Sequence, residues 1–324
     1  MSTEARLLVS SSPHLRDRAT TRTLMLDVIV ALIPALVASY LVFGVRAVAL
    51  TFVTVAAAVL AEAAARRIMK REDTISDLSA VVTGLLLAFN LPPTLPYYMA
   101  AIGAVVAVVV AKQLFGGLGS NFMNPALVGR VLLVISFPVA MTRWTVLDGA
   151  DAVAAATPLA QLKAAAAAGS AVPGTGGLPS YVDLLLGTHA GCVGEVSVLA
   201  LLVGAAYLLA RRTISPWAPL AFVGTVGLFA LVAGQPPLYH MMSGGLILGA
   251  FFMATDYATT PLSWKGKLAF GIGCGLLTGL IRLFGGMEEG VSFAILLMNI
   301  VTPHIDKWTR PVPLGGGVRH ARSA

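Results

Sequence analysis

Residues 24–45, LMLDVIVALIPALVASYLVFGV, contain a single charged side chain, that of Asp27. A helix that crosses the hydrocarbon core of a bilayer needs about 20 consecutive, predominantly apolar residues. This segment meets the requirement by itself. It therefore predicts a membrane-spanning helix, against which the rest of the chain can be compared.

The remaining sequence has the same character. Of its 324 residues, 57% are hydrophobic and only 11% are charged, and the mean hydropathy is +0.85. Soluble domains carry about 25% charged residues. Nine further apolar runs follow the first, at residues 47–65, 78–91, 97–114, 122–140, 191–210, 215–234, 238–254, 267–284 and 290–305. The sequence predicts an all-α polytopic membrane protein with about ten transmembrane helices.

Two of these runs are predicted to be broken or re-entrant segments. Residues 78–91 form a short run that ends in Asn90-Leu91-Pro92-Pro93. Residues 122–140 follow Asn121 and begin with Phe122-Met123-Asn124-Pro125. Neither run is a complete, uninterrupted span.

The distribution of positive charge predicts the orientation. The first 23 residues are polar and basic, and the apolar stretch after them is too long for the core of a cleavable signal peptide. With this end in the cytoplasm, the positive-inside rule places Lys and Arg in the termini and the even-numbered connections. Seventeen of the 22 basic residues lie there. We expect an inner-membrane protein with both termini in the cytoplasm.

A weak internal similarity predicts two five-helix halves. Leu114-Phe115-Gly116-Gly117 ends the fourth run, and Leu283-Phe284-Gly285-Gly286 ends the ninth. An odd number of helices in each unit makes the second unit insert upside down, which gives an inverted repeat. The expected parts are a cytoplasmic segment (1–23), a first repeat (24–140), an outer, periplasmic loop (141–190), a second repeat (191–305) and a cytoplasmic tail (306–324).

The outer loop carries the strongest candidate for chemistry, the segment DAVAAATPL at residues 151–159. Thr157 offers a hydroxyl, and Pro158 biases it toward an extended backbone. A phosphoester would need such a hydroxyl on an accessible, deformable segment. The same two residues also fit an N-cap Thr followed by Pro at the first position of a helix. The residues alone leave both interpretations open.

This segment resembles the flavinylation motif of the NqrB/RnfD family, the membrane subunits of sodium-pumping quinone reductase and of the Rnf ferredoxin–NAD oxidoreductase. That motif is an acidic residue followed by Ser/Thr-Gly-Ala-Thr, often continuing Pro-Leu. The resemblance implies that Thr157 carries FMN through a phosphoester installed by a flavin transferase, with Asp151 and Pro158 as motif residues. The departure is Ala154-Ala155 in place of Ser/Thr-Gly.

The resemblance covers essentially the whole chain. It includes Ser11 to His14, Gly117 to Ala126 and Thr255 to Pro261. The lack of a longer N-terminal extension favours the Rnf-type members. The resemblance implies a second, non-covalent flavin, riboflavin or FMN, and a complex that couples ferredoxin/NAD redox chemistry to Na⁺ or H⁺ movement. The implied partners are the A, B, C, E and G subunits, both membrane and peripheral, of an Rnf-type complex.

Asn121 and Asn124 are candidates for holding that second flavin or another ligand. Two amides, small residues and a Pro at a helix start would expose backbone N–H groups inside the protein. Such a helix N-terminus carries a partial positive charge and suits an anionic flavin or a phosphate. The alternative is an ordinary helix start at the membrane interface.

Five ionisable residues lie in or near the apolar runs, and such residues pair with one another or line pathways. They are Asp27, Arg130, Glu195, Asp256 and Arg282. We expect a structural pairing role for each. Asp27 and Arg130 are of opposite sign, although the sequence cannot show whether they touch.

Several chemistries are excluded for this chain alone. It has two cysteines, whereas an iron–sulfur cluster needs about four thiolates. Its histidines show no paired spacing for haem or zinc, no dinucleotide motif appears, and no basic, aromatic-interleaved stripe suggests nucleic-acid binding. The leading interpretation is an electron-carrying subunit. The alternatives are a stand-alone solute transporter or channel with an inverted repeat, and a passive assembly scaffold.

Overall fold

The computed structural model describes residues 20–148, 151–154, 156–167, 178–195, 197–285 and 290–311. The motif at Ser11 to His14, most of the tail predicted from residue 306, and the loop residues 168–177 lie outside these ranges. Ala155, one of the two residues that depart from the flavinylation motif, also lies outside them.

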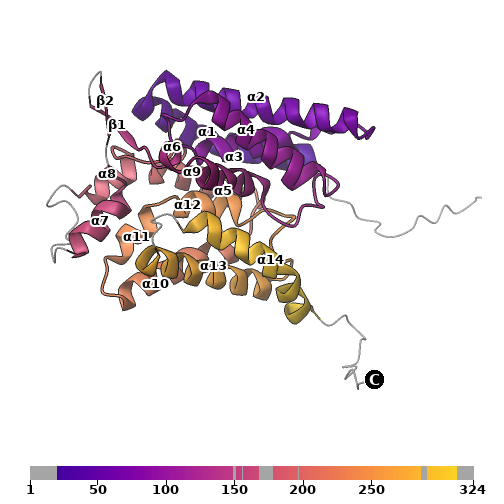
Figure 1. Cartoon of the computed structure of the whole chain (residues 1–324). Helices are drawn as coiled ribbons and strands as arrows, with labels where there is room; N and C mark the ends of the chain where they lie inside the picture. Colours follow the sequence, from indigo (N-terminus) through magenta and orange to yellow (C-terminus); the bar gives the residue numbers. More distant parts are fainter. Residues whose placement is uncertain are drawn as a thin grey trace, which may run out of the picture.

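Seven helical segments and a short turn of helix make up the first half (Figure 1). They are α1 (Thr21–Phe43), α2 (Val45–Ile68), the 3₁₀ turn η1 (Ile75–Asp77), α3 (Ser79–Phe89), α4 (Tyr97–Val105) with its π-helical continuation η2 (Val106–Gln113), α5 (Pro125–Ser136) and α6 (Pro138–Met141). The second half contains α9 (Val198–Ala210), α10 (Trp217–Val232), α11 (Pro237–Met242), α12 (Leu246–Leu248), the π-helical η3 (Gly249–Met253), α13 (Trp264–Phe284) and α14 (Val291–Thr309).

The connection between the halves has its own structure. Strands β1 (Thr145–Asp148) and β2 (Asp151–Ala154) form an antiparallel hairpin, in which Thr145 pairs with Ala154 and Asp148 with Asp151. Helices α7 (Pro158–Ala167) and α8 (Tyr181–Leu186) follow. The prediction of an all-α chain is therefore correct except for this one small hairpin, which lies beyond the helical runs.

Among the described residues, three helices are individually long and apolar enough to cross a membrane: α1, α2 and α13. The apolar helices α3, α4–η2, α5, α9 and α10 are shorter. The structure thus has the character of a multi-pass membrane protein, but it does not confirm ten complete spans. At 1.5 Å per residue, α3 is only about 16 Å long, about half the thickness of the hydrocarbon core.

Polar groups explain why α3 ends at Phe89. The side-chain amide of Asn90 donates to the carbonyl oxygen of Leu86 (2.7 Å). This carbonyl in the last helical turn therefore bonds to a side chain instead of to a further backbone N–H. The turn at residues 193–194 then covers the end of the helix. Val193 N–H donates to the Leu91 carbonyl and Gly194 N–H to the Phe89 carbonyl, both at 2.9 Å.

The predicted continuous run at residues 238–254 is wrong, because the chain breaks inside it. Ser243 separates α11 from α12, and Gly244 and Gly245 both adopt φ of +66°. Side-chain-bearing residues rarely adopt this left-handed conformation, so two adjacent glycines permit the break. Only α12 and η3 remain as a short helix that ends at Met253.

Contacts between connections define two ends of the bundle. At one end, Arg71 donates to the Gln113 carbonyl (3.2 Å) and Ser263 Oγ donates to Thr309 Oγ1 (2.7 Å). At the other end, Arg46 donates to the Thr94 carbonyl (2.9 Å). Figure 1 shows the end of α14 on the right and α7, α8 and the hairpin on the left. We call these the basic end and the hairpin end.

The basic end has the charge that its name implies. Its described residues include Arg66, Arg67, Lys70, Arg71, Lys112, Arg211, Arg212, Lys265, Lys267, Lys307 and Arg310, whereas Arg46, Arg143 and Lys163 lie toward the hairpin end. Among the described residues, most of the charges on which the orientation prediction depends therefore lie at one end of the bundle.

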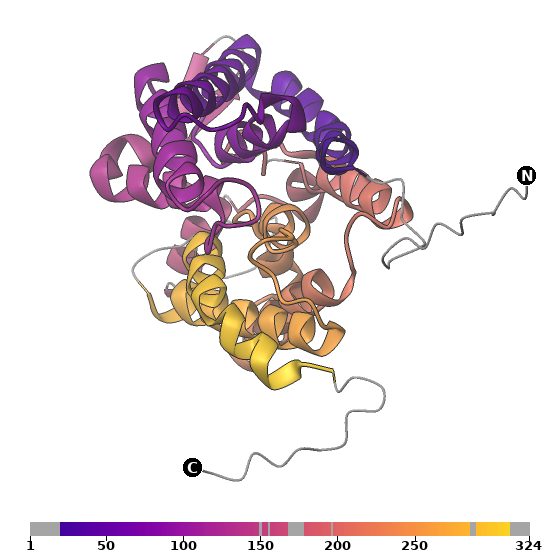
Figure 2. The ribbon, with the colours of Figure 1, turned by 90° about the vertical axis from the view of Figure 1, so that its right-hand side faces the viewer.

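The two halves are visible as separate groups of helices when the bundle is seen from the basic end (Figure 2). Helices α1 and α9 pack together across the boundary. Their contact requires Gly204, because a Cβ on this residue would overlap the carbonyl oxygen of Ala31. Close backbone approach at a glycine is typical of helix packing in membranes.

We expect Gly204→Ala to destabilise the protein by about 1–3 kcal/mol, because the added methyl group must separate α1 from α9. Gly224→Ala is the matched control, since Gly224 also lies within a helix but has open space around its Cβ position. Thermal unfolding in detergent should show a lower midpoint for the first variant only. An equal midpoint in both variants would contradict the close packing of these helices.

Candidate functional site

Thr157 lies directly before α7 and caps it. Its Oγ1 accepts a hydrogen bond from the backbone N–H of Ala160 (3.3 Å), and its carbonyl accepts from Gln161 N–H (3.0 Å). Pro158 is the first residue of the helix. A backbone N–H at this position has no partner within the helix, so proline loses no hydrogen bond there. The N-cap interpretation of the sequence is therefore correct. Capping does not exclude a phosphoester on Thr157, because the hydrogen bond that its hydroxyl oxygen accepts from the helix is long.

Burial distinguishes Thr157 from the accessible residue that the sequence suggested, since only 4% of its surface is exposed. The following helix packs into a small apolar cluster made by Leu162, Leu178, Leu184 and Tyr239, which is separate from the main core. Such a satellite cluster opens more readily than the main core. Modification of Thr157 in the folded protein therefore requires local displacement of α7.

The other motif residue, Asp151, is the first residue of β2. The hairpin pairing that begins with Asp151 and Asp148 ends at Ala154, three residues before Thr157. The described motif residues therefore lie on β2 and at the start of α7, at the hairpin end.

Asn124 also caps a helix, which corrects the expectation of exposed N–H groups there. Its Oδ1 accepts from the N–H groups of Ala126 (3.1 Å) and Leu127 (3.4 Å). Its Nδ2 donates to the carbonyl oxygen of Met253 (3.3 Å), the last residue of η3. Asn124 thus connects the start of α5 to the end of a short helix from the other half.

Asn121 has a free acceptor. Its Nδ2 donates to the Met123 carbonyl (3.1 Å), but its Oδ1 is buried and has no hydrogen-bond partner among the described residues. The residue is 5% exposed. Buried polar atoms without partners are uncommon and require an explanation, such as a bound ligand.

A cavity near the basic end brings Asn121 and Asn124 together. Its polar wall contains Ser79, Thr83, Lys112, Asn121, Asn124, Thr213, Thr255, Asp256 and Tyr257, and its apolar wall includes Met25, Val28, Val82, Leu86, Leu208, Phe251 and Phe252. Mostly apolar walls with a few polar groups are typical of sites for small organic ligands. The cavity lies between residues of both halves.

Lys112, which lines this cavity, forms a buried ion pair with Glu62. This pair was not predicted from the sequence. Lys112 Nζ lies 2.7 Å from Glu62 Oε2 and 2.6 Å from Ser79 Oγ, and the two charged side chains are 2% and 0% exposed. Thr74 Oγ1 donates to the other carboxylate oxygen of Glu62 (2.7 Å). Two features of the sequence could have indicated this pair: Glu62 lies within the apolar run 47–65, and Lys112 lies near the end of the run 97–114.

Asp27 pairs with Arg211 and not with Arg130. Its Oδ2 lies 3.4 Å from Arg211 Nε, and its Oδ1 accepts from the Tyr207 hydroxyl (3.0 Å). Arg130 instead donates to Asn90 Oδ1 (2.6 Å) and lies within hydrogen-bond distance of Ser292 Oγ (3.0 Å). This second contact joins α5 to α14 across the two halves.

The remaining three ionisable residues make hydrogen bonds at turns and helix ends. Arg282 donates to the carbonyl oxygens of His240 (2.6 Å) and Ser243 (2.9 Å), which closes the end of α11. Glu195 Oε1 accepts from Cys192 N–H (3.0 Å). Asp256, in the turn after η3, accepts from Thr259 Oγ1 (3.0 Å). Burial raises the pKa of the Asp256 carboxyl, and its hydrogen bonds oppose that shift.

Metal ligation has no candidate among the residues that the structure describes, because no three His, Cys, Asp or Glu side chains gather there. Cys192 and Cys274 are both buried and unbridged. The candidate sites are therefore the hydroxyl of Thr157 at the hairpin end and the cavity of Asn121 and Asn124 near the basic end.

Comparisons with known proteins identify relatives along almost the whole chain. Residues 8–315 match the family described as the NQR2, RnfD, RnfE family. The D subunit of the Na⁺-translocating ferredoxin:NAD⁺ oxidoreductase complex of Acetobacterium woodii is 48% identical over 309 residues, with 95% of each chain covered.

Two further relatives have similar names. The D subunit of the proton-translocating ferredoxin:NAD⁺ oxidoreductase complex of Clostridium ljungdahlii is 44% identical over 318 residues, covering 95% of this chain and 96% of the relative. The D subunit of the ion-translocating oxidoreductase complex of Escherichia coli is 37% identical over 344 residues, covering 94% and 97%.

Proposed function

Because the chain belongs to the NQR2, RnfD, RnfE family, we propose that it is the D-type membrane subunit of an ion-translocating ferredoxin:NAD⁺ oxidoreductase complex. The observation that carries this conclusion is the match to two such subunits at 48% and 44% identity over 95% of the chain. The coupled ion is Na⁺ in one relative's name and H⁺ in the other's.

We further propose that Thr157 carries covalent FMN. The flavin would supply one- and two-electron transfer, and the chain would supply the attachment point. A phosphoester on an N-cap residue places its negative charge at the positive end of the α7 dipole, next to N–H groups of the first turn. Packing of α7 in the small satellite cluster, rather than in the main core, supports access by a flavin transferase.

The cavity lined by Asn121 and Asn124 is the proposed site of a second, non-covalent flavin, riboflavin or FMN. Two features support this proposal: the buried Asn121 Oδ1 can accept a ligand N–H, and the walls are largely apolar. A planar, mostly apolar ring with polar edges fits that combination.

An inverted repeat of two five-helix units, at residues 24–140 and 191–305, is the proposed plan of the membrane part. Equivalent elements of the two halves contact each other: α1 packs on α9, and α5 packs on α14. Each half also contains a shortened helix at the corresponding place, α3 in the first and α12–η3 in the second. Such paired interruptions are typical of inverted-repeat membrane proteins.

The orientation that we propose has the basic end and both termini in the cytoplasm, and the hairpin end outside the inner membrane. Single cysteines at Lys70 and at Thr188, introduced into a variant with both native cysteines replaced by Ala, should react with a membrane-impermeant thiol reagent from opposite sides. In intact cells we expect labelling only at position 188. Labelling only at position 70 would reverse the orientation.

Partners must supply the chemistry that this chain lacks. We propose that the A, B, C, E and G subunits provide the iron–sulfur centres and the nicotinamide site, because about 30 Å of hydrocarbon separates the two faces and the described residues offer no metal ligand set. In mild detergent the chain should co-purify with these subunits, and alone it should neither oxidise reduced ferredoxin nor reduce NAD⁺.

The same preparation tests the alternative of a stand-alone transporter. A flavin-fluorescent band at the position of this chain on a denaturing gel, together with co-purified subunits, supports the redox function. A monomeric, colourless protein that moves a solute across vesicle membranes would contradict it.

A further inference from the structure

A second cavity opens at the basic end, beside the turn that joins α9 to α10. Its lining includes Arg212, Ser215, Tyr257, Leu262 and Lys267. The three chain segments that form it are this turn, the loop after η3 and the first turn of α13.

The two cations of this cavity have no side-chain partner in the part of the chain that the structure describes. Neither the guanidinium of Arg212 nor the Nζ of Lys267 makes a side-chain hydrogen bond or ion pair with any residue that the structure describes, whereas the neighbouring Arg211 is paired with Asp27. Arg212 also has a left-handed backbone, with φ of +57°. This conformation ends α9 in the usual way, because Arg212 N–H donates to the Leu209 carbonyl and Thr213 N–H to the Leu208 carbonyl, both at 3.0 Å.

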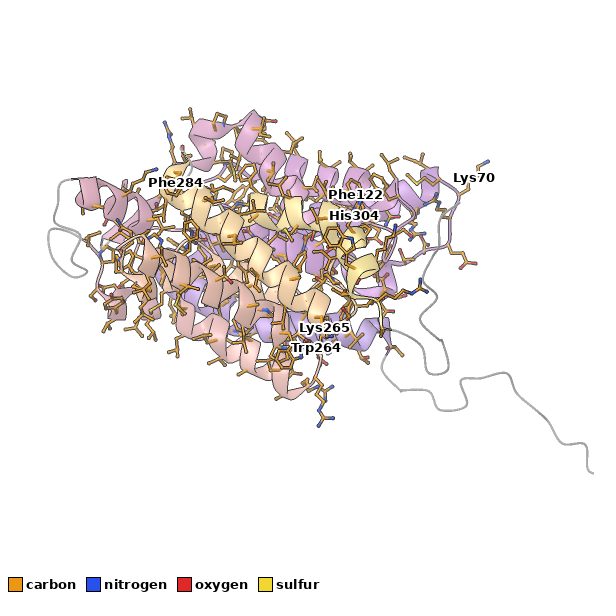
Figure 3. All side chains as sticks on the ribbon, turned by 90° about the horizontal axis from the view of Figure 1, so that it is seen from below. Lys70, Phe122, Trp264, Lys265, Phe284 and His304 are labelled. Atoms are coloured by element: carbon orange, nitrogen blue, oxygen red, sulfur yellow. The ribbon has the colours of Figure 1, made fainter. Side chains whose placement is uncertain are left out.

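Exposed apolar and aromatic side chains surround the opening. Leu262 is 84% exposed, and Trp217 and Trp264 are 47% and 54% exposed. The two indole rings lie 6.0 Å apart, and Lys265 Nζ lies 5.6 Å from the Trp264 ring. Figure 3 shows Trp264 and Lys265 together at one end of α13, opposite Phe284. Tryptophans at a helix end are typical of the level of the lipid headgroups.

We propose that this cavity binds the headgroup phosphate of an anionic phospholipid, between Arg212 and Lys267, with the acyl chains along Leu262 and the tryptophans. Basic pockets between transmembrane helices on the cytoplasmic side are suited to anionic headgroups. A soluble anion would use the cations but not the apolar rim, so the rim favours a lipid over free phosphate. The proposal goes beyond the redox function and does not depend on bound flavin.

One carboxylate in the cavity wall opposes an anion, that of Asp256. Its oxygens accept hydrogen bonds from Thr259 Oγ1 (3.0 Å) and from the side chain of Asn121. The two cations therefore dominate the charge that a headgroup meets.

The test uses the complex purified from native membranes, with bound lipid identified by mass spectrometry and affinity measured by exchange with labelled phosphatidylglycerol. We expect Arg212→Gln and Lys267→Gln each to weaken binding about fivefold, and the double variant about 25-fold, because each cation near a membrane surface contributes about the same attraction. Lys70→Gln is the matched control, since Lys70 is an exposed cation of the same end of the bundle that lies in another connection and does not line the cavity.

Three results would overturn the proposal. One is a double variant that keeps phosphatidylglycerol as well as the wild-type protein does. Another is equal competition by the zwitterionic phosphatidylcholine, and the third is displacement of the lipid by millimolar inorganic phosphate, which would assign the cavity to a soluble anion. These measurements report bound lipid and not electron transfer or covalent flavin at Thr157, so failure here is separable from failure of the proposed redox function.

Discussion

Thr157→Val should abolish covalent flavin completely while the protein still inserts in the membrane. The substitution keeps the size of the side chain and removes the only hydroxyl to which we assign the phosphoester. It also removes the N-cap of α7, which costs about 1 kcal/mol. In-gel flavin fluorescence, normalised to protein, measures the outcome.

Three further variants separate attachment from helix capping. Thr157→Asn keeps a good N-cap and lacks a hydroxyl, so it should fold normally and carry no flavin. Thr157→Ser keeps both properties and should retain flavin. Thr188→Val removes a hydroxyl that donates to Asp183 Oδ1 at the same end of the bundle (2.9 Å), and should leave the fluorescence unchanged. A fluorescent Asn variant would show that the flavin is attached elsewhere.

Lys112→Met should destabilise the protein by about 3–5 kcal/mol, the second large effect that we expect. The substitution leaves the fully buried Glu62 carboxylate without its cation, and breaking a buried ion pair from one side has this magnitude. The midpoint of thermal unfolding and the yield of folded protein in detergent should both fall. The cavity beside Lys112 should also lose its non-covalent flavin.

A double variant and a surface variant are the controls for this prediction. Glu62→Gln combined with Lys112→Met removes both charges and should recover a substantial part of the lost stability, because no buried charge remains unpaired. Lys70→Met changes an exposed lysine at the basic end of the bundle (Figure 3) and should stay within about 0.5 kcal/mol of wild type. Equal losses in the single and double variants would contradict a pairing role for Glu62.

The sequence predicted the class of fold well because apolar length is a local property. Residues 24–45 and 47–65 correspond to α1 and α2 within a few residues, and the short run at 78–91 is α3, which ends where Asn90 and two prolines begin. The break at Ser243–Gly245 was missed because Gly is common in membrane helices. Whether a glycine bends or continues such a helix depends on its tertiary neighbours.

The candidate site shows the same division between local and tertiary information. The N-cap geometry of Thr157 and Pro158 follows from adjacent residues, and the sequence contained it as one of two interpretations. The burial of Thr157 and the pairing of Glu62 with Lys112 depend on segments far apart in the chain. Covalent attachment of FMN to Thr157, which rests on a motif resemblance and this geometry, stays a prediction.

The measurement that tests the central claim most directly is the mass of the proteolytic peptide that contains Thr157, taken from the complex purified from native membranes. We expect a peptide heavier by one FMN less one water, with fragmentation that localises the added mass to Thr157. An unmodified peptide from a complex that still transfers electrons would contradict the claim that this chain carries its flavin there.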